Sequence, residues 1–297
     1  MKKLIGTGVA LVTPFHTDLS IDYPSLQRII EHVLQGGVDY LVVMGTTAES
    51  ATLSSKEKKD VLAFSRKVLK GRLPLVYGLG GNATQAVLNE LEETDFSGVD
   101  ALLSVSPYYN KPSQSGIIQH YEAIADACPV PVILYNVPGR TMSNMTAATT
   151  LHLAEHPNII GMKEASGNLE QCMQIAHKKP DDFLLISGDD MITTALKAIG
   201  AEGLISVLAN AYPAIISSII HGDSESSKKS TFKLLEINPL MYEESNPVGV
   251  KCLMNHLGLC ENTVRLPLAA ASENLCERII SAANHLEKEQ VMDTQVG

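Results

Sequence analysis

Eight short apolar runs, separated by segments with helical spacing, constrain the fold of this chain more than any other feature of its sequence. Each run is nearly continuously apolar, which is typical of parallel strands that are covered on both faces. The runs are Val9–Thr13, Tyr40–Met44, Leu75–Tyr77, Ala101–Val105, Val132–Tyr135, Ile159–Lys163, Phe183–Ser187 and Gly203–Val207. Eight strands that alternate with helices over about 200 residues predict an α/β fold, the (β/α)8 TIM barrel.

The segments between the runs carry helix signals. In the first segment, apolar residues recur at i, i+3, i+4, i+7 and i+8 from Leu26 to Leu34, with Asp22 placed to cap the helix and Gly36 to end it. Three joins between a helix and a run share a glycine followed two residues later by an acid: Gly37–Asp39, Gly98–Asp100 and Gly200–Glu202. We expect each glycine to end its helix in the left-handed conformation and each acid to lie where a strand begins.

An open, doubly wound sheet is the alternative fold, but such sheets usually have fewer strands and a glycine-rich turn after the first one. Gly6–Gly8 precedes the first predicted strand and lacks the third glycine of a dinucleotide-binding motif. After Leu208 only helices are predicted, at Ala214–His221, Ser227–Ile237, Val248–Leu257 and Glu273–Leu286. We therefore expect a barrel over residues 1–207 and a C-terminal helical extension over residues 208–297.

Charge and composition argue against several classes of function. The 33 Asp and Glu outnumber the 23 Lys and Arg, and a formal charge of −10 disfavours nucleic acid or an anionic membrane as partner. No apolar run approaches the roughly 18 residues that span a bilayer. Five cysteines without a Cys-x-x-Cys pair predict a reduced, cytoplasmic protein. None of the nine histidines has a metal-ligand spacing with another histidine, or with an acid at a predicted strand end, so no metal site is predicted.

Catalytic groups of such a barrel lie where the strands end and in the loops that follow. Lys163 differs from most of the 17 lysines because it closes an apolar run, Ile159–Met162. Loss of solvation there disfavours the charged amine, and a neutral amine can attack a carbonyl and form a Schiff base. The alternative is a lysine whose stem packs on the barrel while its ammonium group reaches water.

Other predicted strand ends supply polar groups that could serve such an amine. Tyr135 and Tyr109 could transfer protons, and Thr46 could connect them because a hydroxyl both donates and accepts. Arg140 suits a substrate carboxylate, since its planar fork matches two oxygens. Each has a plainer alternative: tyrosines that are half-buried with satisfied hydroxyls, and an arginine paired with a surface acid.

Five motifs follow the predicted strands in order: Gly45–Ser50, Ser106–Asn110, Tyr135–Thr141, Lys163–Gly167 and Ser187–Asp190. Together they resemble the motifs of the dihydrodipicolinate synthase family. The resemblance covers nearly the whole chain, and later stretches that share it are Asn246-Pro247, Val250-Lys251 and Arg265–Leu268. It implies a Schiff-base lyase that condenses pyruvate with L-aspartate 4-semialdehyde to 4-hydroxy-tetrahydrodipicolinate, on the path to diaminopimelate and lysine.

The resemblance also implies a role for each candidate residue in the chemistry. Lys163 would form the imine with pyruvate, and Tyr135 would act as general acid and base. Thr46 and Tyr109 would complete a proton relay, with Tyr109 reaching into the site of a neighbouring subunit. The covalent imine would replace any bound cofactor or metal.

Further residues would bind the two substrates. By resemblance, Thr47 and the backbone of Ile205 hold pyruvate, and Arg140 binds the carboxylate of the aldehyde. The resemblance further implies a homotetramer built as a dimer of dimers. The shared tyrosine by itself would require at least a dimer.

Two other functions compete with this interpretation. Another pyruvate-dependent aldolase, such as N-acetylneuraminate lyase or a 2-keto-3-deoxy sugar-acid aldolase, would share the lysine and its tyrosine. Val137–Thr141 and the pair Tyr108-Tyr109 favour the synthase. A barrel that has lost catalysis and only binds would require a broken set of catalytic residues, and here the set is complete.

The chain departs from the family pattern at a few positions. Ala48 replaces a usual glycine, which matters if that backbone needs a positive φ, and Gly249 replaces a usual proline. In lysine-inhibited relatives, two histidines and a glutamate occupy the positions of Ser55, Lys58 and Ala86. Because the glutamate supplies the charge opposite the amine of the ligand, we expect weak or absent inhibition by lysine.

Overall fold

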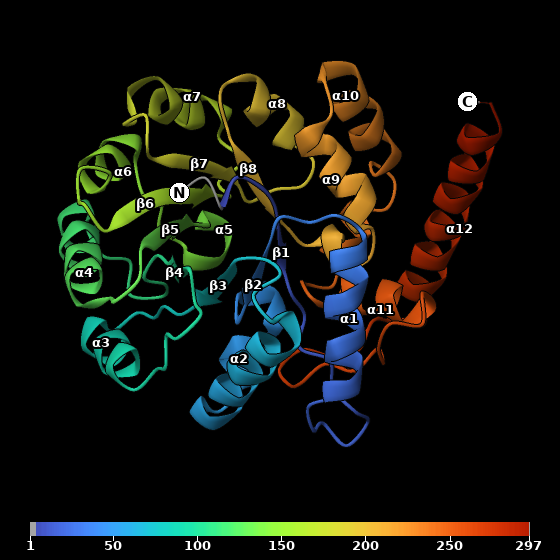
Figure 1. Ribbon diagram of the computed structural model, residues 1–297, viewed down its shortest axis with the longest axis horizontal. Coiled ribbons are helices and arrows are strands. Elements are labelled where there is room, and N and C mark those ends of the chain that lie inside the picture. The colour runs from blue at the N-terminus through green and yellow to red at the C-terminus, as the bar shows by residue number, and fades with distance from the viewer. Residues whose placement is uncertain (1–3, 297) are drawn as a thin grey trace.

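The computed structural model describes residues 4–296 and confirms the predicted barrel. Eight parallel strands hydrogen-bond in sequence order, and β8 pairs with β1 to close the sheet (Figure 1). The strands are β1 (Gly6–Ala10), β2 (Tyr40–Val43), β3 (Leu75–Gly78), β4 (Ala101–Val105), β5 (Val132–Asn136), β6 (Ile159–Glu164), β7 (Leu184–Ser187) and β8 (Gly203–Ser206).

Helices surround this barrel, and a short helix, α5, follows β5 (Figure 1). They are α1 (Tyr23–Gln35), α2 (Ser55–Leu69), α3 (Thr84–Glu92), α4 (Gln114–Ala127), α5 (Pro138–Thr141), α6 (Ala147–Leu153), α7 (Leu169–Lys178) and α8 (Thr193–Ala198). The predicted ends of α1 are confirmed: the Asp22 carboxylate accepts from the N–H of Ser25 at 2.9 Å, and Gly36 caps the C-terminus. The sequence therefore encodes this helix through its apolar face and both of its caps.

The prediction for the start of the first strand is wrong. Gly6–Gly8 lies within β1, which ends at Ala10, three residues before the predicted end. Gly8 has to be small, because a Cβ at this position would collide with the ring of Tyr40 on β2. Pairing with β2 and β8 therefore sets the strand, although its first residues lack apolar side chains.

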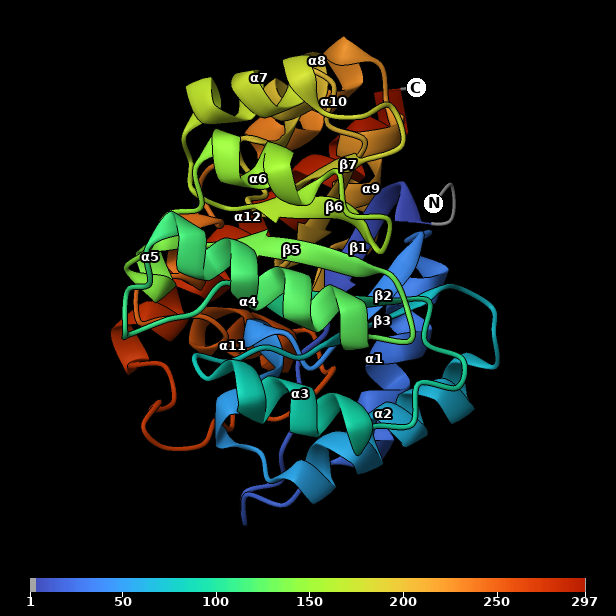
Figure 2. The ribbon, with the colours of Figure 1, turned by 90° about the vertical axis from the view of Figure 1, so that its left-hand side faces the viewer.

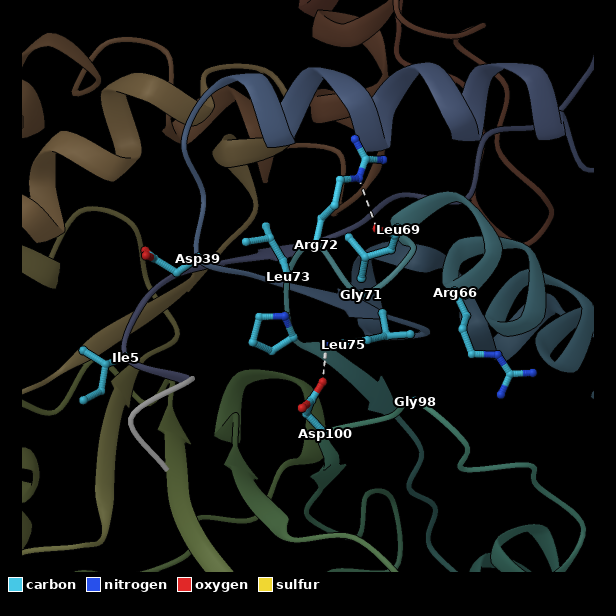
Figure 3. Close-up of a pocket in the computed structure, with 11 residues that line it drawn as sticks. Ile5, Asp39, Arg66, Leu69, Gly71, Arg72, Leu73, Leu75, Gly98 and Asp100 are labelled. Atoms are coloured by element: carbon cyan, nitrogen blue, oxygen red, sulfur yellow. Dashed lines mark hydrogen bonds between the residues drawn. The ribbon is translucent and has the colours of Figure 1, made fainter.

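Three acids fasten the ends of the barrel where strands begin. The preceding glycines all have positive φ, of 74°, 72° and 104° for Gly37, Gly98 and Gly200. Each acid donates its backbone N–H to one residue of the preceding strand and accepts the N–H of the same residue with its carboxylate. The pairs are Asp39 with Thr7 (carboxylate to N–H 2.7 Å), Asp100 with Leu75 (2.9 Å; Figure 3) and Glu202 with Leu185 (2.9 Å). The repeated glycine-and-acid motif thus forms the same pair of hydrogen bonds to the preceding strand at three places.

After β8 the described chain forms helices, as predicted, but the helix predicted at Ser227–Ile237 lies at Ser224–Lys233, where Asp223 caps its start. The helices are η4 (Leu208–Asn210), α9 (Pro213–His221), α10 (Ser224–Lys233), η5 (Pro239–Met241), α11 (Val248–His256) and α12 (Glu273–Val296). The predicted end of the last helix at Leu286 is wrong, because Glu287–Gln290 are strong helix formers and the helix continues. These helices gather on one side of the barrel beside α1 (Figure 1).

The division at residue 207 stays a prediction, since α9 packs directly on β1 and β8. None of the helices in the described part of the chain combines the length and the apolar character needed to cross a membrane.

Candidate active site

A cavity of about 580 Å³ opens where the strands of the barrel end. In the side view of Figure 2, α5 lies at this end of the barrel. The walls come from strand ends, from the turn after β2, from α5 and from the segment between α10 and α11. Polar residues of the lining include Thr46, Thr47, Tyr135, Arg140, Lys163, Asp189, Asn238, Tyr242 and Asn246.

Neighbouring strands place Lys163 beside Tyr135. The two residues are register partners on β6 and β5, and Lys163 Nζ lies 4.5 Å from the centroid of the tyrosine ring. Lys163 is buried, and no carboxylate of the described residues forms an ion pair with its amine. Gly188 after β7 leaves space for the side chain, since a Cβ there would lie 3.0 Å from Lys163 Cε. A buried, unpaired amine at the wall of a cavity is suited to nucleophilic attack.

The turn after β2 brings two threonines to the same cavity. Thr46 and Thr47 lie in η2 (Thr46–Ala48), and Thr47 Oγ1 accepts a hydrogen bond of 3.0 Å from Asn246 Nδ2. Ala48 does not adopt a positive φ, whereas the next residue, Glu49, is left-handed with φ 54°. The methyl group of Ala48 is therefore compatible with the turn.

Arg140 extends from α5 to the cavity and makes no ion pair with the described acids, so its guanidinium is available to an anion. Tyr242 lines the same cavity from the segment after η5. Desolvation by the surrounding protein raises the pKa of the Tyr242 phenol well above its usual value, and the charges of Asp190 and Asp189 raise it further. The phenol therefore stays protonated and can donate a hydrogen bond.

Asp190 holds the loop after β8 against the end of β7. Its Oδ2 accepts the N–H of Leu208 at 3.1 Å and that of Val207 at 3.3 Å, whereas its Oδ1 has no partner among the described residues. Burial raises the pKa of the Asp190 carboxyl to about 6. A buried carboxylate with one unsatisfied oxygen thus lies next to the cavity residue Asp189.

The opposite end of the barrel contains a second cavity, of about 520 Å³ (Figure 3). Arg72 lines it and makes two bonds of 2.7 Å to Glu31, while Arg66 bonds Asp95 at 2.9 Å. Asp100 accepts from the N–H of Leu75. These charged groups are already bound within the fold, so we assign the candidate site to the other end.

Comparison with known proteins identifies the family. The sequence model described as "Dihydrodipicolinate synthetase family" matches residues 3–286. The chain belongs to this family. The 4-hydroxy-tetrahydrodipicolinate synthase of Cytophaga hutchinsonii is 50% identical to it over 293 residues, which cover 97% of this chain and 99% of that protein.

Solved structures of family members share the fold. The chloride-inhibited dihydrodipicolinate synthase from Acinetobacter baumannii, complexed with pyruvate, has a TM-score of 0.93 and 36% identity, covering 96% of this chain and 99% of that one. The family member from Cyanidioschyzon merolae, with lysine bound, has a TM-score of 0.92 and 34% identity, with the same coverage. These relatives favour the synthase over the other pyruvate-dependent aldolases.

The structure gathers five of the seven predicted site residues around one cavity: Thr46, Thr47, Tyr135, Arg140 and Lys163. Two predicted residues do not line it. Tyr109 follows β4 with φ 73° and is 86% exposed. Ile205 is buried within β8, two residues before Val207, which does line the cavity. Their family roles stay predictions.

Sequence reasoning missed one wall of this cavity. Asn238, Tyr242 and Ser245 come from the helical extension, whereas the catalytic groups of such a barrel are expected where the strands end. The neighbouring Asn246-Pro247 motif was the available signal. Gly249, where the family usually has proline, lets α11 approach η5, because a Cβ there would collide with the backbone of Leu240 and Met241. The described residues include no group of three or more His, Cys, Asp or Glu placed to hold a metal ion.

Proposed function

We propose that this chain is a 4-hydroxy-tetrahydrodipicolinate synthase, which condenses pyruvate with L-aspartate 4-semialdehyde. The observation that carries the proposal is the buried, unpaired amine of Lys163 beside Tyr135, in a cavity that also presents the unpaired guanidinium of Arg140. Both substrates combine a carbonyl with a carboxylate, so an amine nucleophile and an anion-binding group match them. Family membership and the pyruvate complex of the relative from Acinetobacter baumannii support this assignment.

Lys163 is the proposed nucleophile. Its neutral amine attacks the ketone carbon of pyruvate, and one water leaves as the imine forms. The imine withdraws electrons, so a base can take a proton from the methyl carbon and produce an enamine. Tyr135 is the proposed acid and base for these transfers, and Thr46 and Tyr109 are the further hydroxyls of the relay.

The enamine carbon then forms the new carbon–carbon bond with the aldehyde, whose oxygen takes up a proton. The amine of the second substrate attacks the imine carbon, closes the ring and releases the amine of Lys163. Overall, one water is lost for each pair of substrates. We assign Arg140 to the carboxylate of the aldehyde, and Thr47 with the backbone of Ile205 to pyruvate. This scheme uses no bound cofactor.

We assign the product to diaminopimelate and lysine biosynthesis, and the enzyme to the cytoplasm as a homotetramer built as a dimer of dimers. The side chain of Tyr109 is exposed, so it is free to reach a second copy of the chain. The five free cysteines suit a reducing compartment.

Borohydride reduction in the presence of pyruvate tests the proposal. The imine should be trapped as a stable adduct, and mass analysis of peptides should place it on Lys163. An adduct on another lysine, or no adduct with the active protein, would contradict the proposed nucleophile. Release of product from pyruvate and aspartate semialdehyde tests the second half of the reaction.

A further inference from the structure

Lys251 of α11 lies within an apolar run, Val248–Met254, and is fully buried, with 0% of its surface exposed. It does not line the active-site cavity. Its Nζ donates to Glu49 Oε1 at 2.5 Å and to the carbonyl of Thr263 at 2.8 Å, and lies 4.2 Å from the centroid of the Phe15 ring. The partners of the Lys251 ammonium group therefore all lie inside the protein.

Its partner Glu49 ends the turn that carries Thr46 and Thr47. Glu49 is buried and adopts φ 54°, a conformation that is uncommon for residues other than glycine. Its N–H donates to the carbonyl of Thr46 at 3.0 Å, which closes the turn. Its second carboxylate oxygen accepts the N–H of Arg265 at 2.9 Å. Both oxygens of Glu49 thus attach the turn to the C-terminal extension.

A second link joins the same two regions. Asn246, which precedes α11, donates from Nδ2 to Thr47 Oγ1 at 3.0 Å. The close packing of α11 on η5, which Gly249 permits, fixes the helix that carries Lys251. The turn is therefore held by residues about 200 positions later in the chain, and the ion pair is the one charged link between side chains among these three.

Stability alone does not account for a buried ion pair. Desolvation lowers the pKa of Lys251, and the charge of Glu49 opposes this effect. Well-packed apolar residues in place of such a pair often leave a protein equally stable or more stable. What the pair provides is a fixed distance and direction between α11 and the turn.

We propose that Lys251 and Glu49 are positioning residues whose buried ion pair holds the Thr46–Thr47 turn where it binds pyruvate. This inference rests on the proposed function, because it assumes that the turn contacts pyruvate. Lys251 and Glu49 lie outside the cavity lining and act through the two threonines. A misplacement of reacting groups by about 1 Å lowers catalysis by up to about a hundredfold, so a small displacement of the turn is enough.

Lys179 offers a matched control at the other end of the barrel. It is largely buried, bonds Glu202 at 2.7 Å and donates to the carbonyl of Phe183 at 2.7 Å. Its contacts are of the same kind as those of Lys251, one carboxylate and one carbonyl. They connect the starts of β7 and β8, away from the active-site cavity.

The experiment compares Lys251→Met, the double variant Glu49→Gln/Lys251→Met, and the corresponding Lys179→Met and Glu202→Gln/Lys179→Met. Thermal unfolding measures stability, and borohydride trapping at increasing pyruvate gives the concentration for half-maximal adduct formation. We expect both single variants to lose stability, because each leaves a carboxylate without its ammonium partner, fully buried at Glu49 and partly buried at Glu202, and both double variants to regain it. The half-maximal pyruvate concentration should rise about tenfold or more in both Lys251 variants and stay at the wild-type value in both Lys179 variants.

The double variant of the Glu49 pair separates the two explanations. A purely structural role predicts that pyruvate affinity returns together with stability, and that result would overturn the inference. An equal loss of affinity in the Lys179 variants would also overturn it, since general destabilisation would then suffice. If Lys251→Met does not fold, the double variant decides alone. Absence of any pyruvate adduct in the wild type would instead refute the proposed function.

Discussion

The two ends of the barrel hold cavities of similar volume, about 580 Å³ and about 520 Å³, but they use their polar residues in opposite ways. Where the strands begin, Asp39 and Asp100 each bond a neighbouring strand, as Figure 3 shows for Asp100, and Arg72 binds Glu31. Where the strands end, Lys163 and Arg140 have no acidic partner among the described residues. The availability of polar groups, rather than the volume of the hollow, distinguishes the reactive end from the structural end.

Two carboxyl groups, those of Asp95 and Asp190, have pKa values shifted in opposite directions. Near the structural end, hydrogen bonds from Ser97 and the charge of Arg66 lower the pKa of Asp95 to about 2. At the reactive end, burial raises the pKa of Asp190 to about 6. The charged form is thus stabilised at Asp95 and disfavoured at Asp190, and a raised carboxyl pKa beside a cavity is typical of functional sites.

The largest effect should come from removing the proposed nucleophile. Lys163→Met keeps an unbranched side chain without the amine, so kcat should fall by about a thousandfold or more and pyruvate trapping should disappear. Arg72→Met at the other end removes two exposed bonds to Glu31 and should leave kcat within about twofold of the wild type. Steady-state assays of both variants measure the contrast, and equal losses would break it.

Asp190→Asn should change the pH dependence of stability. The pKa of this carboxyl rises from 3.8 to about 6 on folding, so its contribution to stability is complete below about pH 3.8 and is lost as the pH rises through about 6. The shift corresponds to about 3 kcal/mol of unfolding free energy, which the wild type should lose between about pH 4 and pH 7. Asparagine does not ionise, so the variant should not show this loss. Urea unfolding at several pH values measures it.

Asp95→Asn is the matched control for that titration. The pKa of Asp95 is lowered, so its contribution is present above about pH 3.8 and is lost only as the pH falls toward about 2. Between about pH 4 and pH 7 this variant should therefore keep the wild-type slope. A wild-type slope in Asp190→Asn as well would show that Asp190 is not the titrating group.

Most of the fold could be predicted because buried parallel strands are nearly continuous apolar runs in the sequence. The first strand shows where this rule ends. Its start at Gly6 depends on pairing with β8, and its glycine at position 8 depends on the ring of Tyr40 across the sheet. Neither requirement is visible in the neighbouring residues, because both come from segments far along the chain.

In the candidate site, too, local sequence identifies some residues, while others depend on contacts with distant parts of the chain. Lys163 and Lys251 carry the same sequence signal, a lysine in an apolar run, and both are buried. Only the structure shows that Lys163 reaches a cavity while Lys251 meets Glu49. Tyr242 has no local signal at all, because its place in the wall depends on how the extension packs against the barrel end.

Arg140→Ala tests the free guanidinium at the reactive end. Loss of a charge-assisted bond of about 1.5–3 kcal/mol should lower kcat/KM for aspartate semialdehyde by about tenfold or more, while pyruvate trapping stays intact. Arg66→Ala, which removes a bond to Asp95 at the other end, should leave both quantities unchanged. Unaltered kcat/KM for the aldehyde in Arg140→Ala would show that another group binds its carboxylate.

A small hollow of about 70 Å³ beside the turn after β2 extends the comparison to regulation. It is lined by Lys58 and Glu90, which form an ion pair of 3.4 Å. Glu57, the other acid that could replace the missing glutamate at Ala86, is bound by Arg265 at 2.6 Å. Glu90 and Glu57 thus both form ion pairs within the fold, as Arg72 and Arg66 do at the structural end.

The smallest effect should therefore come from adding L-lysine. Glu57 and Glu90 already form ion pairs within the fold, and Lys58 would add a like charge to a ligand ammonium group. Binding should therefore be weaker than in a site that supplies a free glutamate by about tenfold or more. We expect half-inhibition only above about 1 mM, an affinity of about 4 kcal/mol. Titration of lysine into the steady-state assay measures this half-inhibition.

The double variant Ala86→Glu/Lys58→His restores the missing negative charge and replaces the competing lysine, so it should become more sensitive to lysine. Half-inhibition of the wild type well below 1 mM would show that a carboxylate already paired within the fold can still bind a ligand. Pairing would then no longer distinguish the two ends of the barrel.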